Sequence, residues 1–351
     1  MNDENEILVE GILNAGESHK PLTAMQVAVP IEVINAVKAA PLTKFGESID
    51  ESSKSFSNQI LKYDWLTINA KGRMVLTNFS VPWIAIAVKN LSIENAPTIN
   101  DKAIILRALD SSLEKYVNGA NRDPYPSRAR DGADGSGQEG GSGAEGVWGG
   151  DGLTVHTPKI FFFFQNIDVA TQDPPAGGVH IRIIADGPKG GNGGNGGPGQ
   201  DGGHGGSGTS SQCRNVTFPI NHCYECVAGP GDGGRGGNGG IGGRGGAAAA
   251  GGNAGDVWFI GPKPDLAKTG YFGVAQKGGA PGNPGLAGGP GKWGGGGGGG
   301  YQCKCCTVGG GSKGDGTEPT PSTRGPGPVS ALHGVDGDTF RLERNNGDLW
   351  P

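Results

Sequence analysis

Glycine occupies every third position in four separate tracts of the sequence, residues 137–152, 187–208, 231–246 and 279–300. A strict period of three is the repeat of an extended left-handed helix with three residues per turn and a rise of about 3.1 Å per residue. Such helices can lie side by side, with backbone N–H and C=O groups bonded to their neighbours. A flexible linker is the alternative for a glycine-rich stretch. The strict period, the four copies and the aromatic and cysteine residues between them favour packed segments.

The amino-acid composition agrees with an unusual architecture. The chain has 351 residues, of which 72 are glycine and 24 proline, while hydrophobic residues make up only 34%. This glycine and proline content is typical of low-complexity or collagen-like chains, so one conventional core across the whole chain is excluded. In the second and third tracts two of every three residues are often glycine, as in residues 233–246. Only the fourth tract, in residues 279–291, is collagen-like in sequence.

Charge and hydropathy argue against two classes of partner. The formal net charge of −5 provides no bulk attraction for nucleic acid. No apolar run reaches the roughly 18 residues that a membrane-spanning helix needs. The N-terminus, residues 1–6, is acidic and lacks an apolar segment, so we expect no classical secretory signal.

The triplet pattern resembles the polyglycine-II bundles of a few protein families. These are the glycine-rich snow flea antifreeze protein, the N-terminal glycine-rich domain of Obg-type GTPases, and the glycine-rich tail-tip adhesins of T-even-like phages. The resemblance covers about residues 130–330 and rests on GGX and GXX triplets. It implies a stiff scaffold that displays loops. The likeness to Obg ends there, because the chain has no G-x-x-x-x-G-K-[ST] loop for a nucleotide. The cysteine-bearing inserts and the C-terminal tail depart from the simplest adhesin pattern.

A second internal repeat lies outside the tracts, at an offset of 76 residues. Residues 82–96 align without gaps to 158–172, and residues 103–110 align to 179–186. Apolar residues alternate in both copies, which predicts a strand, a polar turn and a second strand in each unit. Chance similarity between β-rich segments is the alternative. The identical pairs are Pro82/Pro158, Ile84/Ile160, Asn90/Asn166, Ile105/Ile181 and Asp110/Asp186.

Other elements are predicted from local patterns. A helix is expected over residues 30–40, with Pro30 near its first turn, and a second helix over residues 55–63. Residues 69–72 indicate a turn between two strands. Short strands are expected at residues 256–261 and 339–342. The run of four phenylalanines at 161–164 predicts a strand buried between layers or at an interface.

The expected fold is mainly β with a polyglycine-II helix bundle and a small N-terminal α+β portion. Residues 1–130 would form the α+β portion, used for attachment or assembly. Residues 131–308 would form the glycine-rich bundle with interleaved strands and cysteine inserts. Residues 309–351 would form a loop rich in glycine, proline and serine, followed by a C-terminal strand.

The cysteines form two clusters that interrupt or follow glycine tracts. An even number of cysteines in a region with little core favours disulfides, here joining the two clusters. A zinc site is the alternative, because C-x2-C is a standard zinc-binding pair whereas C-x-C-C is not. We otherwise expect no cofactor. The six residues are Cys213, Cys223, Cys226, Cys303, Cys305 and Cys306.

No motif for catalysis stands out. The chain lacks H-E-x-x-H. One G-x-S-x-G match, at residues 310–314, and several G-x-G-x-x-G matches carry no weight at this glycine content, so no enzyme is expected. Arg235 and Arg244 lie in RGG triplets, which can bind RNA, but two arginines in an acidic chain are better explained as solvated. Aromatic residues beside the tracts either cap the bundle or act as exposed binding anchors, since Trp and Tyr dominate interface hot spots. The candidates are Trp148, Trp258, Tyr271, Phe272, Trp293 and Tyr301.

These observations favour a non-enzymatic structural or recognition protein, whose rigid scaffold displays loops that bind a protein or glycan on a surface, as an adhesin does. The N-terminal portion would contact an assembly partner. The expected place is the extracellular space or the surface of a particle or virion, whereas metal-bound cysteines would indicate the cytoplasm. The alternatives are a metal-binding protein or enzyme built on the cysteine clusters, an ice-binding protein and a secreted toxin.

Overall fold

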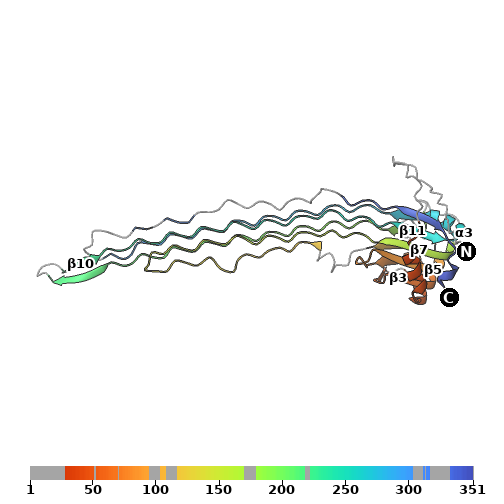
Figure 1. Cartoon of the computed structure of the whole chain (residues 1–351), viewed down its shortest axis with the longest axis horizontal. Coiled ribbons are helices and arrows are strands. Elements are labelled where there is room, and N and C mark those ends of the chain that lie inside the picture. The colour runs from red at the N-terminus through yellow and green to blue at the C-terminus, as the bar shows by residue number, and fades with distance from the viewer. Residues whose placement is uncertain are drawn as a thin grey trace.

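The computed structural model describes residues 28–50, 53–69, 71–94, 103–107, 117–169, 179–217, 222–302, 311–312, 314–316 and 333–350. Figure 1 shows an elongated molecule with a base of sheets at one end. A long bundle of extended segments leaves this base and ends near β10 (His222–Ala228). We call this bundle the glycine shaft, formed by residues 117–157, 186–211, 229–255 and 276–302 with the described parts of 311–337.

Two parallel sheets form the base, and the chain alternates between them. The first sheet has the order β1 (Lys44–Ile49), β3 (Ile60–Ile68), β5 (Trp83–Ile93), β7 (Lys159–Val169), β11 (Val257–Gly261), β13 (Thr339–Glu343). The second sheet has the order β12 (Phe272–Ala275), β8 (Ile181–Ile184), β6 (Ala103–Arg107), β4 (Arg73–Leu76), β2 (Ser53–Phe56). Successive turns of the chain therefore stack along both sheets, with parallel pairing throughout each of the two.

The core lies on both faces of the first sheet. Side chains alternate along a strand, so Phe162 and Phe164 join the cluster shared with the second sheet, while Phe161 and Phe163 join a cluster on the outward face. All four rings are buried. The prediction that this phenylalanine run is a strand buried between layers is confirmed.

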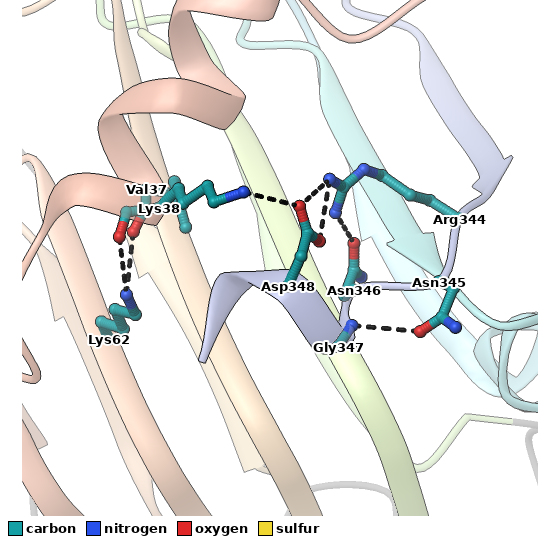
Figure 2. Close-up of polar contacts among 8 residues, drawn as sticks. All are labelled: Val37, Lys38, Lys62, Arg344, Asn345, Asn346, Gly347 and Asp348. Carbon is teal, nitrogen blue, oxygen red and sulfur yellow. Dashed lines mark hydrogen bonds and ion pairs between the residues drawn. The ribbon is translucent and has the colours of Figure 1, made fainter. Parts of the chain in front are cut away.

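The outward cluster is covered by α1 (Ile31–Ala39) and by the C-terminal segment with its short helix η3 (Gly347–Leu349). Figure 2 shows how the end of α1 is held: Lys62 Nζ donates to the carbonyls of Val37 at 3.1 Å and Lys38 at 3.3 Å. It also donates to Ala40 O at 2.9 Å. These carbonyls end a helix and lack partners within it, so a cation placed there is favourable.

The C-terminal segment is fixed by polar contacts to three strands. Asn346 is fully buried, and its Nδ2 donates to Phe164 O and Ile260 O, each at 2.8 Å. Asp348 accepts from Arg344 and Lys38 (Figure 2). Trp350 Nε1 donates to Tyr63 O at 3.1 Å. The C-terminal segment is therefore fixed against the outward face of the first sheet.

The expected fold class, mainly β with a polyglycine-II bundle and a separate N-terminal α+β portion, is wrong. The chain has a six-stranded parallel sheet and few helices, an arrangement of α/β type. Strands from before residue 130 pair directly with strands after it, as β5 does with β7. The physical reason is that parallel pairing joins segments far apart in sequence, and a local hydrophobic pattern does not identify the partner strand.

Several local predictions can be compared with the structure. The helix at residues 30–40 is confirmed as α1, and the strand at 339–342 as β13. The helix over residues 55–63 is wrong, because β2 ends at Phe56 and β3 begins at Ile60. The 76-residue repeat corresponds to neighbouring strands: β5 and β7 pair with a register offset of 76, so Asn90 faces Asn166. The second halves pair with an offset of 78, as Ala103 with Ile181.

The segments of the glycine shaft are joined laterally by backbone hydrogen bonds every third residue. Gly194 N–H donates to Gly150 O at 2.8 Å, Gly246 N–H to Gly194 O at 2.8 Å, and Gly285 N–H to Gly246 O at 3.0 Å. Segments running away from the base bond both to one another and to segments that return. Interior backbone groups thus find partners without forming a sheet.

Close approach of the segments explains where glycine is needed. A Cβ built on Gly196 would lie 2.1 Å from Gly243 O, and one on Gly240 would lie 1.9 Å from Ala144 O. In residues 233–246 two positions of each triplet are buried and the third is exposed. The outer segment 279–300 buries mainly one position in three. The double-glycine triplets of residues 233–246 therefore belong to an inner segment, whereas the all-glycine run 294–300 lies in the outer one.

Asparagine and aspartate occupy outer positions of the shaft, where their side chains join neighbouring segments. Asn192 N–H donates to Asn118 Oδ1, and Asn192 Oδ1 accepts from Asn283 N–H, each at 2.9 Å. Asp201 Oδ1 accepts from Lys292 N–H at 2.8 Å. These contacts extend the lateral bonding to residues that do not point inward.

Glu47 in β1 makes the stability of the base depend on pH. Burial alone would raise its pKa, but hydrogen bonds and charges from Lys54 and Lys44 outweigh burial and hold the pKa below its usual value. The unfolded chain then takes up this proton more readily, so the stabilisation is present above the unfolded-state pKa of about 4.3 and is lost as pH falls through the folded-state pKa.

We expect Glu47→Gln to lower the melting temperature at neutral pH and to reduce the further loss of stability toward pH ~3. Thermal unfolding across that range measures both effects. Glu343→Gln, at an exposed position of β13, is the matched control and should keep the wild-type dependence. Equal acid dependence of the Glu47→Gln variant and the wild type would show that the Glu47 ion pairs add nothing.

Candidate binding surface at the distal end of the shaft

Three segment ends meet where the glycine shaft is farthest from the base. Gly231 N–H donates to Thr209 O at 2.8 Å, and Gly300 N–H donates to Gly231 O at 3.0 Å. Ser211 donates twice to Tyr301 O, from its backbone N–H at 2.8 Å and from Oγ at 3.0 Å. The end of the shaft is therefore as tightly bonded as its middle.

Exposed side chains of varied chemistry gather at this end. Tyr301 is 78% exposed and Val227 is 61% exposed. We call the exposed set the distal patch, formed by Thr209, Ser210, Gln212, Arg214, Val227 and Tyr301. Hydroxyl, amide, guanidinium and aromatic groups suit recognition of a polar surface, with the aromatic ring as an anchor.

A hairpin that carries part of the distal patch forms the tip of the molecule (Figure 1). It consists of β9 (Gln212–Thr217) paired antiparallel with β10, and Cys213 faces Cys226 in the register. Facing Cα atoms of such a pair lie about 4.5–5.5 Å apart, within the span of a disulfide. The register thus brings together Cys213 and Cys226, two cysteines of the same cluster. The sequence pattern predicts disulfides between the two clusters. The side chains of Cys213, Cys223 and Cys226, and the whole of Cys303, Cys305 and Cys306, lie outside the described part, so disulfides stay a prediction.

The six aromatic candidates are not brought together. Tyr301 lies in the distal patch, and Trp148 and Trp293 lie on the shaft, 56% and 45% exposed. Tyr271 is at the base, in the short helix η2 (Thr269–Tyr271), with its ring edge-on to His180. Trp258 and Phe272 are 6% and 5% exposed in the core, so their choice as binding anchors is wrong. Trp258 belongs to β11, which follows the third tract, and Phe272 belongs to β12, which precedes the fourth. Proximity in sequence to glycine did not reveal that both side chains are buried.

Trp148 has polar neighbours of its own on the shaft. Its Nε1 donates to Glu145 Oε1 at 3.0 Å, and the Arg244 guanidinium lies 5.5 Å from the ring centroid. Arg122 Nε donates to Trp148 O at 2.9 Å. These contacts account for this exposed tryptophan and for Arg244 as parts of the shaft surface.

Sequence reasoning missed most of the distal patch. Thr209, Ser210 and Gln212 carry no motif, and Val227 looks like an ordinary strand residue. The available signal was positional: these residues sit where the triplet period stops, at the end of the second tract and before the third.

Two properties of the described residues bear on cofactors and membranes. Among them, no group of three or more His, Cys, Asp or Glu residues is arranged to hold a metal ion. Within the same ranges, every helix is too short or too polar to cross a bilayer. Comparison with known proteins adds nothing to this, because no family model, curated protein or solved structure matches the chain.

Proposed function

We propose that the chain is a non-enzymatic recognition protein that presents the distal patch and the β9–β10 hairpin to a protein or glycan on a surface. The observation that supports this most directly is the bonding of the shaft. Each segment is joined to its neighbours every third residue over its whole length, so the tip is held at a fixed distance from the base. A rigid scaffold with exposed residues at its end is a common arrangement for recognition.

The base supplies the second half of this proposal. Phe45 of β1 and Ile31 of α1 are 69% and 65% exposed at the base, so these apolar side chains are available for attachment to a larger assembly. In this arrangement the base attaches and the tip binds. The protein would then work outside a cell or on the surface of a particle or virion.

Replacing Tyr301 tests the tip. The labelled full chain is applied to arrays of glycans and of purified cell-surface proteins, and the strongest interaction is titrated with each variant. We expect Tyr301→Ala to weaken binding by about 2 kcal/mol, or roughly thirtyfold, as for an anchor residue. Tyr271→Ala, a matched tyrosine at the base, should bind as the wild type does. Wild-type affinity in both Tyr301→Ala and a chain lacking the hairpin would sink the proposal.

A further inference from the structure

The outward face of the first sheet is only partly covered. The α1 helix and the C-terminal segment pack on Ala85, Ala87, Phe161 and Phe163. Farther along the same strands the face is open, and Asn90 and Asn166 are exposed. A shallow groove of about 320 Å³ lies here, and we call it the groove. It is lined by Trp65, Thr67, Asn90, Leu91, Ser92, Asn166, Ile167 and Asp168.

Strand register arranges the polar lining in two parallel rows. One row is Trp65, Asn90 and Asn166, and the other is Thr67, Ser92 and Asp168. Neighbouring strands are about 4.8 Å apart, so each row spans about 10 Å across β3, β5 and β7. The groove is therefore long enough for an extended ligand.

Trp65 forms an aromatic platform at one end of the first row. A Cβ placed on Gly46 would lie 1.8 Å from the indole ring, so the ring rests directly on the backbone of β1. Glycine at position 46 is what permits this placement. The side chain remains 39% exposed, and an aromatic surface held in place in this way can pack against an apolar ligand face at little entropic cost.

The groove also contains side-chain donors and acceptors that are available to a ligand. Asn166 Nδ2 donates to Asn90 Oδ1 at 2.9 Å, and Asn90 Nδ2 donates to Asp64 O at 3.1 Å. This relay leaves Asn166 Oδ1 as an acceptor. Within the described ranges, the hydroxyls of Thr67 and Ser92 and the carboxylate of Asp168 have no protein partner, so they can bind a ligand.

We propose that this groove binds a neutral oligosaccharide. A sugar ring combines an apolar C–H face, which packs on indole, with hydroxyls that both donate and accept. The lining matches both properties with Trp65, the asparagine relay and the Thr67–Ser92–Asp168 row. Asp168 is the only charged residue in the lining, and it disfavours an acidic ligand. This site is separate from the distal patch and does not depend on the function proposed there.

Calorimetric titration of the full chain with soluble neutral oligosaccharides of hexose and N-acetylhexosamine tests the groove, with acidic oligosaccharides as a comparison. We expect Trp65→Ala to weaken binding about tenfold or more. Asp168→Asn should weaken it roughly threefold to tenfold through lost hydrogen bonds, and this exposed position keeps the test valid if Trp65→Ala does not fold. Trp293→Ala, a tryptophan of similar exposure on the shaft, should leave the affinity unchanged.

Three results would overturn the proposal. The first is that no neutral oligosaccharide binds the wild type. The second is that affinity is lost in Tyr301→Ala but kept in Trp65→Ala and Asp168→Asn, which would place sugar binding in the distal patch. The third is that groove variants change the sedimentation of the chain while sugars do not bind, which would make this face a protein interface.

Discussion

Gly240→Ala is expected to open the glycine shaft near its middle. The new Cβ would lie 1.9 Å from Ala144 O, and backbone on both sides leaves no flexible side chain to move aside. Gly240 also donates to Gln200 O and accepts from Gly291 N–H, each at 2.8 Å. Forcing the segments apart weakens these bonds, so we expect a cost of about 1–3 kcal/mol or more, similar in kind to a glycine substitution in collagen.

Limited proteolysis measures this opening. Gly240→Ala should be cleaved within the shaft under conditions that leave the wild type intact, while the sheets of the base remain resistant. Gly289→Ala is the matched control, because no atom lies within 4 Å of a Cβ built there. If both variants resist protease equally, the segments are held more loosely than their hydrogen bonds indicate.

Phe162→Ala is expected to cause the largest loss of stability in the base. Phe162 is 1% exposed and lies in register between Ile86 of β5 and Phe259 of β11. Its ring centroid is 6.3 Å from those of Phe164 and Phe259. Removing a large side chain from such a site leaves a cavity, and the typical cost is about 3–5 kcal/mol.

Urea unfolding followed by far-ultraviolet circular dichroism gives the measurement for the base. Phe45→Ala removes an equally large side chain that is 69% exposed, and it should change the free energy of unfolding by no more than about 0.5 kcal/mol. A Phe162→Ala variant that unfolds at the wild-type urea concentration would mean that the sheets do not depend on this packing.

Local structure could be predicted from the sequence where the signal was local or strictly periodic. Pro30 and the following apolar spacing were enough to predict α1. The repeat at offset 76 predicted two similar strand units, and the register of Asn90 with Asn166 gives that offset a structural meaning. The glycine period likewise indicated which residues would lie in close contact.

Features that depend on distant segments could not be predicted in the same way. The strand β3 runs through residues expected to form a helix, because pairing with β1 and β5 outweighs local preference. Trp258 follows a glycine tract yet packs on Phe161. The groove beside Trp65 depends on Gly46, nineteen residues earlier, and no motif connects the two.

The lateral bonding of the shaft determines how its length can change. Inserting one residue in the segment 231–252 before Arg235 would shift Arg235 and Asn238 from exposed positions to positions where only glycine fits. A tolerated insertion must therefore be a whole triplet, and it must occur at the same level in the segments bonded to it. Natural or designed variants of this protein should differ in reach by discrete steps of one triplet, about 9 Å each, while the tip can change freely because few residues there belong to the repeat.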